Sequence, residues 1–138
     1  MGAIQNSINS MIGTVGALAG AKVKMDENQA IQAEVARNQA LDIANEIPAL
    51  ENEKKDLALR QTHVEANEKA LNDIANTLDI NSSAKDLQAF SELSEEVDKD
   101  RKMADFAIKT YEGKVKAKTL QLQRLQKVIK RANGLRGI

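Results

Sequence analysis

The chain has 138 residues and a formal net charge of zero, with 20 basic and 20 acidic residues. This length allows one domain at most. The absence of cysteine excludes disulfides and thiolate metal sites, and two Phe and one Tyr are too few to fill an ordinary globular core. Alanine, leucine and charged or amide residues dominate instead, a composition typical of long helices and coiled coils.

The charges are distributed unevenly along the chain. Residues 1–25 carry a net charge of +2, residues 26–108 a net charge of −10, and residues 109–138 a net charge of +8. Both ends are therefore basic and the middle is acidic. Such asymmetry says more about the partners of a protein than its total charge does.

The first 21 residues carry no charged side chain, and we predict that residues 1–24 form an amphipathic helix. Apolar residues recur there at steps of three or four, which we call the N-terminal apolar stripe: Ile4, Ile8, Met11, Val15 and Leu18. Small and amide residues recur about half a turn away, which we call the N-terminal small face: Gly2, Asn6, Asn9, Gly13, Gly16 and Gly20. Such a helix can place one face on lipid or a hydrophobic wall and the other against a close neighbour or a conduit.

Two environments suit this N-terminal helix. Twenty-one helical residues reach about 32 Å, close to the roughly 30 Å of a bilayer core, but the Asn and Gln side chains would need partners or water there. The other environment is a protein assembly in which the helix docks or oligomerises. A cleaved signal peptide is the least favoured alternative, because no Lys or Arg precedes the apolar region and polar residues interrupt it.

From residue 25 to residue 138 we predict a long antiparallel helical hairpin. It comprises helix 26–78, a turn at 79–83 and helix 84–133, with Ser82 or Ser83 capping the second helix. The apolar seam of the first helix is Ala36, Ala40, Ile43, Ile47, Leu50, Leu57, Val64, Leu71 and Leu78. The seam of the second is Leu87, Phe90, Ser94, Val97, Arg101, Ala104, Ile108, Tyr111, Val115, Lys118, Leu122, Leu125, Ile129 and Ala132.

In this hairpin residue i faces residue 162 − i, which places Pro48 opposite Lys114 and beside Gly113. Proline removes one backbone donor, so we expect a kink near Pro48, and Gly113 weakens the facing helix. One hairpin so narrow cannot bury both seams. We therefore predict a homo-oligomer with copies packed side by side.

A run of cations on the second helix forms a candidate site for anionic partners. These residues project within roughly a 100° arc and are called the basic stripe: Lys109, Lys116, Lys127, Lys130 and Arg131. The stripe could contact DNA phosphates without sequence specificity, anionic lipid headgroups, or an acidic helix of a neighbouring copy. No stacking aromatics or zinc-finger spacing supply base readout.

No catalytic, cofactor or metal site is predicted. His63 is the only histidine, and without cysteine it has no second soft ligand to share a metal. The carboxylates are spread along helix faces, and no catalytic triad or phosphate loop can be assembled. We therefore expect a protein that is not an enzyme.

The start of the chain resembles bacteriophage genome-ejection proteins, both the DNA pilot proteins of small phages and short internal virion proteins of tailed phages with short tails. The residues that carry the resemblance are Met1-Gly2-Ala3-Ile4, Ile12-Gly13, Gly16-Ala17 and Ala19-Gly20-Ala21, followed by long polar helices. The resemblance implies a virion component near the portal and tail. Several copies would insert their N-terminal helices into the host envelope on infection and form a conduit for DNA.

Two other functions fit the same residues. The first is a structural helical adaptor or scaffold without a membrane role, in which Ile4, Ile8 and Met11 are buried against protein. The second is a nucleic-acid-binding coiled coil that acts through the basic stripe, and whose affinity for DNA would fall steeply with salt.

Overall fold

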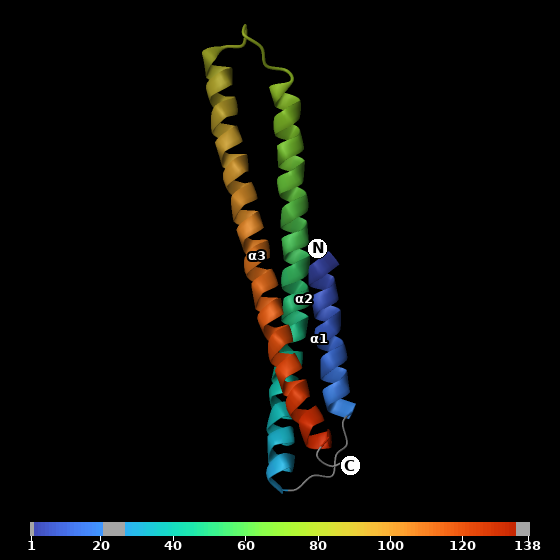
Figure 1. Ribbon diagram of the computed structural model, residues 1–138. Helices are drawn as coiled ribbons and strands as arrows, with labels where there is room; N and C mark the ends of the chain where they lie inside the picture. The colour runs from blue at the N-terminus through green and yellow to red at the C-terminus, as the bar shows by residue number, and fades with distance from the viewer. Residues whose placement is uncertain (1, 21–26, 135–138) are drawn as a thin grey trace. The chain divides into compact units, whose positions relative to one another are not determined.

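The computed structural model describes residues 2–20 and 27–134, which form three α-helices and no strand (Figure 1). Helix α1 spans Gly2–Gly20, α2 spans Glu27–Ala75 and α3 spans Ala84–Gly134. The predicted all-α class is confirmed. The side chains of Ile4, Leu18, Gly2 and Gly20 lie outside the described residues, although their backbone belongs to α1.

The connection between α2 and α3 explains where each helix stops and starts. The Thr77 N–H donates to the Ile74 carbonyl at 2.9 Å, a tighter bond than those of an α-helix, and α2 ends at Ala75, three residues before its predicted end. Asp79 then accepts the Asn81 N–H at 2.8 Å, which forms a turn closed by its own side chain. Ser83 caps α3, because its Oγ accepts the Asp86 N–H at 3.1 Å.

The chain divides into two compact units that each include part of α2 and part of α3. Unit 1 comprises Met1–Asn52 and Glu112–Ile138, and unit 2 comprises Glu53–Tyr111. The division crosses α2 close to Pro48 and α3 next to Gly113. Helix α2 is continuous through Pro48, and no peptide bond in the described residues is cis.

Unit 1 has the larger core because it contains three helices. Figure 1 shows α1 alongside the parts of α2 and α3 that belong to this unit. Ile8 and Met11 of α1 are 1% and 0% exposed. The rest of the core comes from α2 and α3: Ala33, Ala36, Ala40, Ile43, Ile47, Leu50, Val115, Leu122, Leu125 and Ile129. Small alanines on α2 allow neighbouring helices to approach closely.

Unit 2 has a thin core because only two helices contribute to it. Its buried residues are Leu57, Val64, Val97, Ala104 and Tyr111. Between Val64 and Val97 no residue is buried, and the apolar side chains of this stretch, such as Leu71 and Phe90, are at most half-buried. The seam of unit 2 is therefore incompletely covered within one chain.

Ion pairs between α2 and α3 occur in both units. Lys118 pairs with Glu46 in unit 1, and Arg101 pairs with Glu68 in unit 2. Both cations are seam residues of α3. The predicted register gives residues 116 and 94 as the positions facing Glu46 and Glu68, so the observed partners lie two and seven residues further along α3. Long side chains reach diagonally across a helix pair, so an ion pair need not join directly facing positions.

A substitution at Gly113 tests whether this glycine has a structural role. An added Cβ meets no atom within 4 Å, so the Gly113→Ala change gains helix propensity without a clash. We expect the free energy of unfolding to rise by about 0.5–1 kcal/mol in urea titrations followed by circular dichroism. The matched change Ala117→Gly, one turn later at another exposed position of α3, should lower it by a similar amount. A loss of stability in Gly113→Ala would show that the glycine is required.

Candidate functional site

The described side chains of the N-terminal apolar stripe, Ile8, Met11 and Val15, face protein in this structure. Ile8 and Met11 are buried and Val15 is half-buried, all in unit 1. Ile8, Met11 and Val15 thus pack against their own chain, whereas the sequence predicted contact with lipid or a partner protein.

The N-terminal small face is open. Asn6, Asn9, Gly13 and Gly16 are all exposed. A Cβ built on Gly13 or Gly16 would meet no atom within 4 Å, so no helix of the described chain approaches this face closely. The space that glycine leaves for a close neighbour is therefore available to another molecule.

Ile12 adds an apolar group to the exposed surface of α1. Its side chain is 46% exposed, and it lies between the stripe and the small face. Ile12 is not a member of the predicted stripe, in which Met11 follows Ile8, although it also lies four residues after Ile8 and three before Val15. Ile12 is thus an exposed apolar side chain on a helix surface that is uncharged and otherwise formed, among the described side chains, by amide, serine and glycine residues.

The basic stripe is exposed along its whole length. Lys116, Lys127, Lys130 and Arg131 belong to unit 1 and Lys109 to unit 2, and none of the five is buried or half-buried. Two residues that the sequence analysis left out share the outer surface of α3 in unit 1: Arg124, and Leu120 at 56% exposed. Mixed cationic and apolar surface of this kind can bind phosphates or a helix with acidic side chains.

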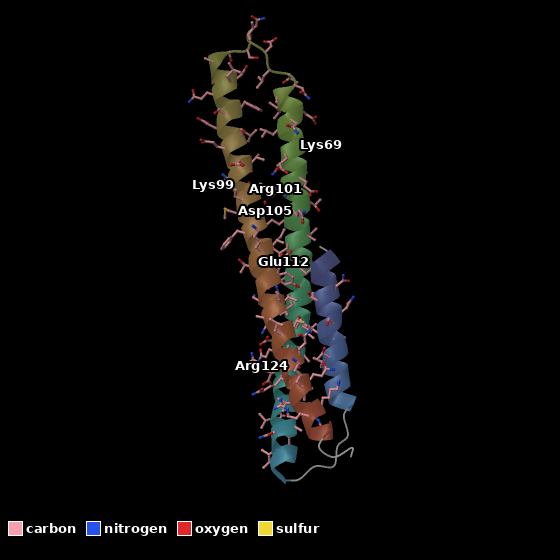
Figure 2. All side chains as sticks on the ribbon, in the orientation of Figure 1. Lys69, Lys99, Arg101, Asp105, Glu112 and Arg124 are labelled. Carbon is pink, nitrogen blue, oxygen red and sulfur yellow. The ribbon has the colours of Figure 1, made fainter. Side chains whose placement is uncertain are left out.

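The electrostatics of unit 2 are dominated by Arg101 and Glu68. The Arg101 Nε donates to Glu68 Oε2 at 3.1 Å, a second guanidinium nitrogen pairs with Oε1, and Asp105 lies 3.7 Å from the guanidinium. These donated hydrogen bonds lower the pKa of Glu68 below its ordinary value of 4.5, while partial desolvation acts in the opposite direction. The same bonds raise the pKa of Arg101. Arg101 points from α3 toward α2 (Figure 2).

The predicted absence of a metal site concerns the acidic side chains and His63. No group of three or more His, Asp or Glu side chains is placed to hold a metal ion within residues 2–20 and 27–134, and His63 is exposed. One open hollow of about 420 Å³ lies on α3 alone, lined by Glu92, Glu95, Glu96, Asp98, Lys99 and Lys102. A second, of about 410 Å³, lies between the two helices of unit 2 around Leu71 and Val97.

Measured by length and mean hydropathy, none of the helices in the described part of the chain qualifies as a membrane span. No protein-family model matches the chain, and no curated protein or solved structure matches it significantly.

Removal of the Glu68 carboxylate should make the free energy of unfolding depend less on pH in the acidic range. Because the pKa of Glu68 is lower in the folded chain, the ion pair stabilises the fold above the ordinary value of 4.5, and this stabilisation is lost as pH falls through the lowered pKa. We expect Glu68→Gln to be less stable than the parent at pH 7 and to equal it at low pH, as measured by urea titration. Asp73→Asn, an exposed carboxylate of the same unit, is the control. An equal deficit at every pH would contradict the charge-based account.

Proposed function

We propose that this chain is a non-enzymatic structural component of a phage particle that assists genome delivery. Copies assemble side by side through their helices, and α1 leaves its site on unit 1 to enter the host envelope. The single observation that carries the proposal is the surface of α1, which is uncharged, open along Gly13 and Gly16, and anchored in the chain by Ile8 and Met11. The resemblance to genome-ejection proteins supplies the setting.

The helical hairpin is part of the proposal. Support comes from the two ion pairs, Glu46–Lys118 and Glu68–Arg101, which connect α2 and α3 at residues far apart in the sequence. Each lies inside one unit, and each uses a cation that interrupts an apolar seam. A hairpin ordered in this way would hold α1 and the basic end of α3 in a fixed relation to neighbouring copies.

The strength of the α1 contact suits a helix that is stored and then released. Burial of one large apolar side chain contributes about 1.5–3 kcal/mol. Because Ile8 and Met11 contribute on this scale, their contact with unit 1 can be exchanged for another apolar contact. An amphipathic helix at a lipid surface buries the same stripe, and its small face can meet water or a second α1. The basic residues Lys116 and Lys127 would then contact anionic headgroups or DNA phosphates.

Burial of Ile8 and Met11 within unit 1 also supports a second candidate, a structural adaptor without a membrane role. In that case α1 is a permanent third helix of the unit 1 core. The two functions differ in one measurable property, which is whether α1 ever leaves unit 1.

Vesicle binding distinguishes the two functions. Ile12→Asn changes an exposed side chain and should leave the fold intact, yet it should weaken co-flotation with anionic vesicles severalfold if α1 enters the lipid surface. Leu41→Asn, at an exposed position of α2 with 50% exposure, is the matched control and should bind like the parent. Equal binding by the parent chain, both variants and a chain without residues 1–21 would favour the adaptor function.

The small face can be tested separately from lipid binding. Because an added side chain at Gly13 or Gly16 meets open space, the double change Gly13→Leu/Gly16→Leu should leave the folded chain and its vesicle binding unchanged. It should reduce dye leakage from vesicles by about tenfold if leakage requires α1 helices to pack closely. The Gly13→Ala/Gly16→Ala chain controls for helix propensity. Undiminished leakage by the leucine variant would show that the small face is not a contact between copies.

A further inference from the structure

The outer face of α3 in unit 2 carries large apolar side chains that nothing in the described chain covers. Phe106 is 71% exposed and Met103 is 53% exposed. Phe106 is nine residues from Val97, which places it about half a turn from the buried side of the helix. It is one of only two phenylalanines in the chain. An exposed aromatic beside a methionine is the kind of anchor found at the centre of protein interfaces.

Cations surround this apolar pair. Lys99, Lys102 and Lys109 are all exposed and lie on the same outer side of α3 as Phe106. Figure 2 shows Lys99 directed away from α2, whereas Arg101 is directed toward it. The segment 99–109 therefore presents a surface that is both apolar and positive.

The preceding turns of the same face have the opposite charge. Glu92, Glu95 and Glu96 are exposed there and line the open hollow of about 420 Å³, together with Asp98 and the two lysines that begin the positive segment. In the described chain Lys102 pairs with Asp98 at 3.0 Å, and Gln88 Nε2 donates a hydrogen bond to Glu92 at 3.4 Å. One helix face is thus divided into an acidic half and a basic, apolar half, and the hollow extends across the boundary between them.

We propose that this face of α3 binds the same face of a second copy in antiparallel orientation. A two-fold axis then places the acidic half of each copy on the basic half of the other, so that every favourable contact occurs twice. Phe106 of each copy enters the hollow beside Glu92 and Glu95 of its partner. The inference rests on the proposed self-association and assigns it to a surface.

The charges on this face of α3 favour a second copy of the chain, rather than an anionic membrane, as its partner. Phe106 and Met103 with three lysines would suit lipid headgroups, but Glu92, Glu95 and Glu96 on the same face would be repelled by them. A parallel pairing of two copies would set acid on acid. Exposed ion pairs contribute little affinity, so Phe106 and Met103 provide the attraction while the charges fix the orientation.

Sedimentation equilibrium of the full chain tests the anchor. Phe106→Asp should raise the dissociation constant of the dimer by about tenfold or more, because it removes the apolar contact and adds an acid opposite an acidic surface. Leu59→Asp changes a side chain of α2 that is equally exposed, at 70%, and should leave the dissociation constant unchanged. Circular dichroism confirms that each chain remains helical.

Charge reversal tests the orientation. Lys99→Glu/Lys102→Glu and Glu92→Lys/Glu95→Lys should each fail to self-associate, since each face becomes uniform in charge. Mixed together they should form a heterodimer with affinity close to that of the parent, because each acidic surface again meets lysines. Restored pairing in the mixture also demonstrates that both variants are folded.

Three outcomes would overturn the inference. A parent chain that is monomeric at all concentrations would contradict both the surface and the proposed self-association. A dimer that is insensitive to Phe106→Asp and to both charge reversals would contradict this surface alone. A monomer whose sedimentation with anionic vesicles is abolished by Phe106→Asp would assign the face to lipid instead.

Discussion

The burial of narrow apolar seams by small and aliphatic side chains is the constraint on which this structure depends. Because the chain has only two phenylalanines and one tyrosine to fill a core, its helices must pack closely to exclude water. Unit 1 achieves this with a third helix, whose Ile8 and Met11 are buried in the same core as Ile43, Ile47 and Leu122. Unit 2 has no third helix, and no residue between Val64 and Val97 is buried. Because of this difference, the apolar seam of unit 2 has the greater need of another molecule to cover it.

Charge follows the same division. Unit 2 carries the acidic stretch of α3 around Glu92 and Glu95, and unit 1 carries most of the basic stripe. The two ion pairs between helices hold α2 and α3 together without contributing much to stability, because both are partly exposed. The ion pairs instead favour one alignment of α2 along α3, because an apolar seam with small residues permits several registers. Polar interruptions of a seam are used in this way in coiled coils.

Much of this fold could be predicted from periodicity, while its tertiary contacts could not. The seam positions Ile43, Leu50 and Val64 are buried because heptad spacing places them on one side of a helix regardless of what they meet. The Ser83 cap follows from local hydrogen-bond chemistry, which a sequence displays directly. The docking of α1 against unit 1 could not be predicted, because the periodicity of α1 shows which face is apolar but not what that face contacts. Phe106 lies off the seam, and its exposure is a property of the folded chain.

The absence of charged side chains from α1 affects the free energy of moving this helix from protein to lipid. Transfer of α1 from protein to a lipid surface requires no charge to lose water, so the free energy of the two locations differs mainly in how well each covers Ile8 and Met11. The open glycines Gly13 and Gly16 contribute nothing to the contact with unit 1, but they permit close packing of helices wherever α1 moves. In the proposed role, the stripe would set how tightly unit 1 holds α1, and the small face would set how closely α1 helices pack after release. The two properties could therefore change independently.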